Sequence, residues 1–391
     1  MFNHLFANRT DDIAIVSGFE IAQKCKKLEA TGKHVVHLEI GEPDFDTPAN
    51  ISEAGIVAIR QGKTHYTPTS GIPALRAAIA NYANKYKQLE VNSDNIVVAS
   101  GAKPMLFFPL LALINPGDEV IYPDPGFSVY KACINLVGGV AVPLTLMEEN
   151  NFRVDLAELE RKITPKTKLL IINSPQNPTG SIFTASDIQA IAELCLRHKI
   201  YVLSDEIYDR MIYTAEKCLS IATIPGMEEQ TIILDGFSKT YAMTGWRIGY
   251  GIMPELLAKK VTQLTVISNS CTAEFTQHAA LEALQGQQIS VDSMIAEFKK
   301  RRDFFIAGLN SITGMHCNIP AGAFYAFPNI SRFGKSSQEV AEHLLNDGLV
   351  AGLAGSNFGA AGEGFIRFSY ATSIENLQLA LERIEASLKK L

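Results

Sequence analysis

Residues 232–250 read IILDGFSKTYAMTGWRIGY. The stretch opens with an apolar, β-branched run, which is typical of a buried strand, and it turns to small and polar residues just before Lys239. Arg247 directly follows Trp246, the single tryptophan of the chain. Lysines are usually solvated, whereas a desolvated lysine has a lowered pKa and becomes a nucleophile toward carbonyl compounds. The stretch therefore predicts a strand that places a reactive amine at its end.

The composition is that of an ordinary globular protein. The chain has 391 residues, 47% hydrophobic and 19% charged, which is enough for two or three domains. The net charge of −6 argues against a nucleic-acid surface. Six scattered cysteines without C-x-x-C spacing favour reduced thiols over a disulfide framework. The N-terminus lacks a signal-peptide core and no apolar run reaches about 20 residues, so we expect a cytoplasmic protein with no membrane partner.

Apolar runs alternate with helical segments on both sides of this stretch. The runs cover residues 96–99, 119–122, 140–146, 168–172, 200–203, 231–234 and 247–251. Several of them lack alternating polar residues, which is typical of strands buried on both faces of a mostly parallel sheet. We therefore expect an α/β fold, with a large domain over residues 46–285 and a mostly parallel seven-stranded sheet between helices.

The two ends of the chain carry a different pattern. The expected elements there are helices over 18–31, 274–309 (broken near 285–286) and 374–388, and strands over 35–40, 323–327 and 364–369. This pattern predicts a smaller α+β domain formed by both termini. Residues 1–45 would supply an N-terminal arm and part of this domain, and residues 286–391 would supply the rest.

Polar residues follow the strand ends, where open α/β sheets bind ligands. The turn Gly101-Ala102-Lys103 precedes a helix, so its free N–H groups could hold a phosphate, although such turns are more often plain connections. Asp205 and Glu206 could suggest a glycosidase pair or a metal site. Adjacent side chains point in different directions, however, and no His or Cys accompanies them. One aspartate in a buried cleft is the favoured interpretation, and no metal is expected.

Arg367 lies within the aromatic run GFIRFS at 364–369. It could be the partner of a structural carboxylate. Alternatively, its planar guanidinium could receive the carboxylate of a ligand.

Taken together, these segments resemble the class I/II aminotransferases of pyridoxal-phosphate fold type I, the aspartate aminotransferase superfamily. The motifs YTPTSG (66–71), NPTG (177–180), SDEIY (204–208) and SK followed by Arg247 occur in the family's order. The resemblance extends from Gly41 to Ala371. It implies a homodimeric enzyme that uses pyridoxal 5'-phosphate to move an amino group between an L-amino acid and a 2-oxo acid.

The resemblance implies a role for each residue around the cofactor ring. Lys239 would hold the cofactor as a Schiff base and act as the catalytic base. Asp205 would pair with the protonated pyridine nitrogen and keep the ring an electron sink. Tyr208 and Asn177 would hydrogen-bond the phenolic oxygen, and Phe127 would stack on the ring.

The phosphate would be bound by Arg247 and by the backbone of Gly101, Ala102 and Lys103, with Tyr66 reaching it from the partner subunit. Many family members carry a phosphate-binding serine three residues before the lysine. That position here is Gly236, so Ser238, directly before the lysine, is the candidate replacement.

The resemblance also implies how the substrate is held. Arg367 would clamp the α-carboxylate, assisted by Asn177 and the Gly41 backbone, so substrate binding should draw the two domains together. Some aspartate-using relatives have a lysine at the position of Lys103, which allows a dicarboxylate, while the aromatic surroundings suit an apolar side chain. We expect broad aminotransferase activity with glutamate and 2-oxoglutarate as one pair.

Two alternatives remain open from the sequence. The same fold could run another reaction, such as β-elimination from cysteine conjugates. It could also be the cofactor-binding effector module of a transcription regulator, which needs a DNA-binding domain ahead of it. The family pattern begins by about residue 40, which leaves no helix-turn-helix of sufficient length in residues 1–35, so we expect an enzyme.

Overall fold

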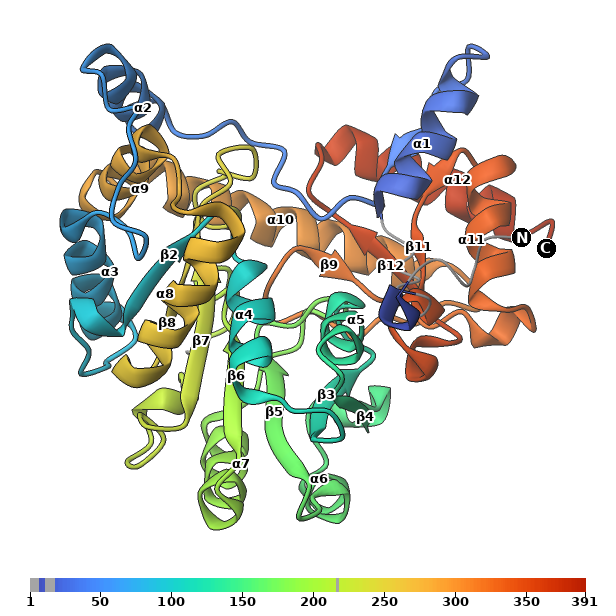
Figure 1. Cartoon of the computed structure of the whole chain (residues 1–391). Helices are drawn as coiled ribbons and strands as arrows, with labels where there is room; N and C mark the ends of the chain where they lie inside the picture. The colour runs from blue at the N-terminus through green and yellow to red at the C-terminus, as the bar shows by residue number, and fades with distance from the viewer. Residues whose placement is uncertain (1–6, 11–17, 216–217) are drawn as a thin grey trace.

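The computed structural model describes residues 7–10, 18–215 and 218–391. The arm expected before residue 18 lies mostly outside these residues. Figure 1 shows a large sheet surrounded by helices and a smaller part, in which the blue N-terminal helix lies beside red C-terminal helices. No helix in the described ranges is long and apolar enough to cross a membrane.

The large sheet contains seven strands. They are β2 (Ile96–Ala99), β3 (Glu119–Asp124), β4 (Val140–Thr145), β5 (Thr167–Asn173), β6 (Tyr201–Asp205), β7 (Thr231–Gly236) and β8 (Gly249–Ile252). Their order is β2-β8-β7-β6-β5-β3-β4. Neighbouring strands are parallel except at β8, which is antiparallel to both β2 and β7. The predicted fold, a mostly parallel seven-stranded α/β sheet, is confirmed.

Both faces of this sheet are buried, because successive residues of a strand point to opposite sides. In β5, Leu169 and Ile171 belong to the core shared with α4 (Pro104–Leu113) and α8 (Glu255–Asn269). Leu170 and Ile172 belong to the core shared with α7 (Ala185–His198). A strand covered on both sides has no polar face, which explains the continuous apolar runs of the sequence.

The sequence pattern misses two helices of the large part. The remaining helices there are α2 (Ala49–Arg60), α3 (Pro73–Tyr86), α5 (Val129–Leu136), α6 (Leu156–Lys162) and α9 (Glu274–Gln285). Neither α6 nor α8 is predicted. In α8, Leu257 and Val261 are buried, but Leu256 and Ile267 are exposed. Its apolar residues therefore do not form the single stripe that marks an amphipathic helix.

Both ends of the chain build the smaller part. Its elements are α1 (Gly18–Glu29), β1 (Val36–His37), α10 (Ile289–Ser311), β9 (Tyr325–Ala326), α11 (Ser337–Asn346), β10 (Val350–Ala351), β11 (Leu353–Ala354), β12 (Ile366–Ser369) and α12 (Ile374–Leu388). The parallel pair β1–β10 joins the two termini, and β12 lies between β11 and β9. Helix α11 is not predicted by the sequence. The domain boundaries after residues 45 and 285 stay a prediction.

Strand β1 is shorter than the run at 35–40 predicts. After His37 the chain changes its partner, since the Leu38 carbonyl accepts a hydrogen bond from the Ser369 N–H at 2.7 Å. Residues 38–48, the crossing segment, run from the smaller part to α2 in the large part (Figure 1). This crossing segment carries Gly41 past the end of the large sheet.

Candidate active site

The candidate residues gather at one edge of the large sheet. Strands β5, β6 and β7 are parallel neighbours, so their carboxyl ends lie side by side. Asn173 and Asp205 end β5 and β6, and Lys239 follows β7 by three residues. This is the edge at which parallel sheets bind ligands.

The Lys239 side chain points to the crossing segment. Its Nζ donates a hydrogen bond to the Gly41 carbonyl at 2.6 Å and lies 5.9 Å from the centre of the Phe324 ring. Burial lowers the pKa of Lys239 to about 8, because the charged amine loses water. Arg367 and other nearby cations lower this pKa further, whereas Glu42 raises it. The amine is therefore a better nucleophile at neutral pH than an ordinary lysine.

If Lys239 holds pyridoxal phosphate, as the sequence resemblance implies, this pKa predicts how the protein without cofactor would capture it. Only the neutral amine attacks the aldehyde, so the capture rate should rise with pH and level off above a midpoint near 8, not near the ordinary 10.5. At pH 8 an ordinary lysine would have roughly one neutral amine in three hundred. Stopped-flow absorbance from pH about 6 to about 10 would measure the profile. Glu42→Gln removes a charge that raises the pKa, so it should move the midpoint down; a midpoint near 10.5 in both proteins would contradict the assignment.

Asp205 is a buried carboxylate with one strong hydrogen-bond partner. Burial raises the pKa of Asp205 to about 6, although the Tyr130 hydroxyl, which donates to Oδ2 at 2.7 Å, lowers it. A buried anion favours a cation placed against its free side. The sequence analysis missed Tyr130. The signal in the sequence was its position three residues after Phe127, and in the structure the two rings lie 5.7 Å apart.

Tyr208 lies beside this carboxylate on the loop after β6. Its hydroxyl is 2.7 Å from the hydroxyl of Tyr325, a residue of β9 in the smaller part. The Tyr208 ring packs edge to face against the rings of Tyr325 and Phe324. Tyr325 thus links the two parts of the molecule directly beside the candidate site.

The turn before α4 has the shape of an anion site. Gly101 has a φ of +89°, and a Cβ there would collide with the guanidinium of Arg247. Helix α4 begins at Pro104; the Gly101 N–H donates to the Ala99 carbonyl at 2.8 Å, but the N–H groups of Ala102 and Lys103 are left to bind an anion. Arg247 itself has a φ of +53° and donates from Nη1 to the Thr244 carbonyl at 2.8 Å. The cation and the free N–H groups therefore lie together.

Gly236, the position where the family pattern departs, is tightly packed. In the β7–β8 pair it lies opposite Gly249, and a Cβ on Gly236 would come to 3.0 Å from the Cα of Gly249. A Cβ on Gly249 would in turn lie 2.6 Å from the backbone nitrogen of Ala102. The turn at residues 101–103 thus packs directly on the backbone of β8 at Gly249. Ser238 is half-buried next to Lys239.

Arg367 lies on β12 with its guanidinium buried among rings. Its Nη2 donates to the Glu39 carbonyl and its Nη1 donates to Asn177 Oδ1 at 3.3 Å. The guanidinium carbon is 4.6 Å from the centre of the Tyr325 ring and 5.1 Å from that of Phe358. Its Nε is buried and has no hydrogen-bond partner in the described part of the chain. A buried donor without a partner is costly, so the arginine is prepared to bind a carboxylate.

Two predicted site residues expose their side chains. Tyr66 is 91% exposed on the loop between α2 and α3, so within one chain it does not join the site. The Lys103 side chain is exposed, with its Nζ 5.8 Å from the centre of the Phe127 ring.

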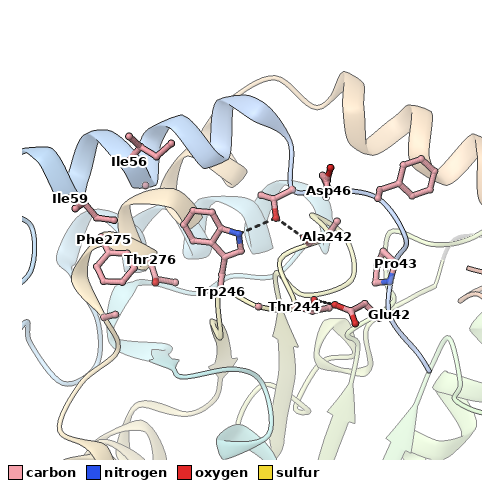
Figure 2. Close-up of a pocket in the computed structure, with 15 residues that line it drawn as sticks. Glu42, Pro43, Asp46, Ile56, Ile59, Ala242, Thr244, Trp246, Phe275 and Thr276 are labelled. Carbon is pink, nitrogen blue, oxygen red and sulfur yellow. Dashed lines mark hydrogen bonds between the residues drawn. The ribbon is translucent and has the colours of Figure 1, made fainter. Parts of the chain in front are cut away.

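A pocket of about 590 Å³ lies between α2 and the loop that follows Lys239. Figure 2 shows Trp246 between the apolar side chains of α2 and the polar end formed by Glu42 and Thr244. The Trp246 Nε1 donates to Thr47 Oγ1 at 3.0 Å, and that hydroxyl donates to the Ala242 carbonyl at 2.6 Å. These bonds fix the loop after Lys239 to the crossing segment.

A buried ion cluster behind the sheet edge was also missed by the sequence analysis. The Nζ of Lys87 lies 2.9 Å from Glu206, 2.6 Å from Asp209 and 3.1 Å from Asp235. Burial lowers the pKa of Lys87, but the three carboxylates outweigh it and hold that pKa well above its ordinary value. The cluster supports the strands that carry Asp205 and Lys239. Lys87 is more than a hundred residues from each of its three partners in the sequence, so no local pattern signals the cluster.

Comparison with known proteins shows to which family the chain belongs. The model of the family aminotransferase class I and II matches residues 33–384. The chain belongs to this family. Class I and II aminotransferases use pyridoxal 5'-phosphate, so the protein is a pyridoxal-phosphate-dependent aminotransferase that moves amino groups between L-amino acids and 2-oxo acids.

Individual relatives agree with the family. The aspartate aminotransferase of Pyrococcus abyssi is 41% identical over 384 residues, which cover 97% of this chain and 98% of the relative. The aromatic-amino-acid aminotransferase 2 of Thermococcus litoralis is 39% identical, with the same coverage. The solved structure of aspartate aminotransferase from Thermus thermophilus with maleate matches with a TM-score of 0.94 at 36% identity, covering 98% of this chain and 99% of that one. The predicted aminotransferase function is confirmed, and these names support it over the alternative reactions.

Proposed function

We propose that pyridoxal phosphate binds at the sheet edge around Lys239 and that the enzyme is a broad aminotransferase for dicarboxylic and aromatic amino acids. The observation that carries this proposal is the convergence on that edge of a lysine of lowered pKa, a buried aspartate and a buried arginine with a free Nε. Few reactions need all three groups. An amine, a carboxylate and a carboxylate-binding cation are the groups that an amino acid and this cofactor require.

The residues at the edge fit the cofactor. A phosphate suits the free N–H groups of Ala102 and Lys103 with Arg247 beside them, while the Gly101 N–H, also expected to bind it, would first have to leave the Ala99 carbonyl. Ser238 is close enough in sequence to contribute. A protonated ring nitrogen suits the buried Asp205, whose carboxylate it would keep charged. Phe127, which is half-buried above Lys103, would cover one ring face.

Polar groups from three other segments would complete the site. Tyr208 and Asn177 would bind the phenolic oxygen. Asn177 also contacts Arg367, so a substrate carboxylate at that guanidinium would lie beside the cofactor ring. Gly41, whose carbonyl now receives the Lys239 amine, would border the same space.

The chemistry follows from these groups. When bound, pyridoxal phosphate supplies an electron sink that makes the substrate Cα–H acidic. Lys239 is the catalytic residue: its neutral amine takes the proton from Cα, and the resulting ammonium releases it later in the half-reaction. Arg367 orients the α-carboxylate so that this C–H faces the lysine. Rings from both parts of the molecule exclude water.

The substrate class rests on the groups around Arg367 and on the names of the relatives. The Lys103 ammonium is free to meet a second carboxylate, as in aspartate or glutamate with 2-oxoglutarate. Phe127, Phe324 and Phe358 offer flat apolar surfaces for an aromatic side chain. Relatives named for aspartate and for aromatic amino acids both cover nearly the whole chain.

Spectral titration tests this function. The visible absorption band of lysine-bound cofactor in the holoenzyme should fade when aspartate, glutamate or phenylalanine is added and return with 2-oxoglutarate. The variant Lys103→Met should weaken the response to aspartate relative to phenylalanine, because only aspartate has a second carboxylate. A band that none of these amino acids changes would contradict the proposal, and release of pyruvate and ammonia from a cysteine conjugate would point to β-elimination.

The proposed enzyme acts in the cytoplasm as a homodimer whose sites are completed by the partner's tyrosine at position 66. All six cysteines are free, as in a reducing compartment. Helix α2 exposes Ile56 and Ile59, which border the pocket of Figure 2. The exposed Tyr66 lies on the loop that follows α2. Exposed apolar side chains next to a pocket are typical of a subunit interface.

Mixing two inactive variants tests the shared site. Lys239→Ala lacks the catalytic amine, and Tyr66→Ala lacks the group expected to reach the partner's phosphate. In a mixed dimer, the subunit with an intact lysine would receive an intact tyrosine from its partner. Refolding the variants together should therefore restore activity to about a quarter of the wild-type level, since half the dimers are mixed and each has one complete site. Activity that equals the average of the separate variants would show that the tyrosine serves its own chain.

A further inference from the structure

Three different ligand types meet in the smaller part of the molecule. The Sγ of Cys25, a ring nitrogen of His37 and a carboxylate oxygen of Glu39 all lie within 4.8 Å of one another. Cys25 lies on α1, and His37 ends β1. Residues two apart in an extended segment point to the same side, so His37 and Glu39 face the helix together.

Glu39 supplies a second, independent observation. Its side chain is fully buried, with 0% exposure. Its Oε1 lies 2.8 Å from His37 Nδ1, but its Oε2 is buried with no hydrogen-bond partner in the described ranges. A buried carboxylate oxygen without a partner is costly, and a cation at this point would remove that cost.

The second nitrogen of His37 is also arranged as in a metal site. His37 Nε2 lies 3.0 Å from Oε1 of Glu29, the last residue of α1. Histidines that bind metals usually donate the other ring N–H to a carboxylate, which fixes the ring and its tautomer. With Nε2–H directed to Glu29, Nδ1 is left for a metal beside Glu39 and Cys25.

We propose that Cys25, His37 and Glu39 form a binding site for a divalent cation of the zinc type, with water as the fourth ligand. One sulfur, one imidazole nitrogen and one carboxylate oxygen are a ligand set that Zn²⁺ accepts. Zinc–ligand bonds of about 2.0–2.3 Å in a tetrahedron place ligand atoms roughly 3.5 Å apart, so small side-chain rotations suffice. On binding, the Cys25 thiol releases a proton to solvent, and any proton held between His37 Nδ1 and Glu39 is released as well, so that the ring binds as the neutral Nε2–H form.

The site would act on the substrate arginine through the backbone. The Glu39 carbonyl accepts a hydrogen bond from Arg367 Nη2, and a Cβ on Gly18 would lie 2.8 Å from the same carbonyl oxygen. Gly18, the first residue of α1, thus contacts the Glu39 carbonyl. A bound metal would join Cys25, farther along α1, to the Glu39 side chain. An occupied site would fix the segment that holds Arg367, and it would raise the melting temperature because the cation binds the folded chain.

Zinc retention by the holoenzyme tests the site. After treatment with a chelator and dialysis against zinc alone, elemental analysis should find one zinc per chain, and calorimetry should find one binding event. Cys25→Ser should weaken this binding by about 100-fold or more, since it removes a ligand rather than a supporting group. Cys195→Ser, which changes another buried helical cysteine, should leave zinc binding unchanged. The melting temperature should rise with zinc in the wild type and in Cys195→Ser, but not in Cys25→Ser.

Glu29→Gln provides a variant that keeps all three ligands and changes a half-exposed side chain. It should fold normally and weaken zinc binding by about 10- to 100-fold, as expected for a carboxylate that supports a metal-bound histidine. Anomalous scattering at the zinc edge should place the metal between Cys25, His37 and Glu39. Zinc that is absent after dialysis, or that binds equally to wild type and Cys25→Ser, would overturn the proposal and leave His37 as an ion-pair partner of Glu29 and Glu39.

Discussion

Replacing Lys239 by alanine should lower kcat for transamination by at least about 10⁴-fold, because the variant loses both the nucleophile that holds the cofactor and the base that moves the Cα proton. The amine lies at the meeting point of the crossing segment and the sheet edge, where burial lowers its pKa to about 8. The visible band of lysine-bound cofactor should be absent from the purified variant. Steady-state kinetics and an absorption spectrum measure the two effects separately.

A matched substitution separates loss of this amine from a general loss of positive charge. Lys300→Ala removes an exposed lysine on α10 and should leave both the spectrum and kcat unchanged. Adding a small primary amine to Lys239→Ala should restore part of the activity, since a free base can enter the space left by the side chain. Normal transamination by Lys239→Ala would show that another group is the base.

Replacing Arg367 by glutamine should lower kcat/KM for amino acids by about 100- to 1,000-fold, because the substrate carboxylate loses a buried, doubly hydrogen-bonded partner. The guanidinium is 5% exposed and has one donor, Nε, without a partner. Glutamine removes the charge and the planar fork but keeps a polar side chain. Arg367→Lys keeps the charge only, and it should recover no more than a part of the loss.

Substrates without a carboxylate provide the control for this prediction. The amine that corresponds to a good amino-acid substrate should react slowly with the wild type and equally slowly with Arg367→Gln, because neither reaction uses the arginine. Arg332→Gln, on the exposed turn after β9, should behave as wild type with both substrates. If Arg367→Gln slowed the amine as much as the amino acid, the arginine would have a structural role instead.

Local sequence patterns were sufficient to predict elements whose burial and chain direction are determined within a few residues. Continuous apolar runs predict strands such as β5 because both faces of that strand are covered. A strand end followed by an isolated lysine predicts Lys239 because the carboxyl ends of parallel strands share one edge. The end of α12 at Leu388 is also predicted, because its apolar residues keep one helical stripe.

Contacts between distant segments could not be predicted. Lys87 meets three carboxylates that lie more than a hundred residues away in sequence, and nothing near Lys87 differs from a surface lysine. Cys25 and His37 carry no spacing typical of metal ligands, because the helix and the strand are brought together only by the fold. Helix α8 was missed because its exposed apolar residues, such as Leu256 and Ile267, obscure the buried stripe.

The stacked glycines at positions 236 and 249 limit the routes by which this enzyme could evolve. A side chain at position 236 requires room next to Gly249, and Gly249 has little space to move because the Ala102 backbone lies against it. A serine introduced at position 236 alone would therefore press on this turn unless the turn shifted as well. We expect substitutions at position 236 and in the turn at residues 101–103 to be non-additive.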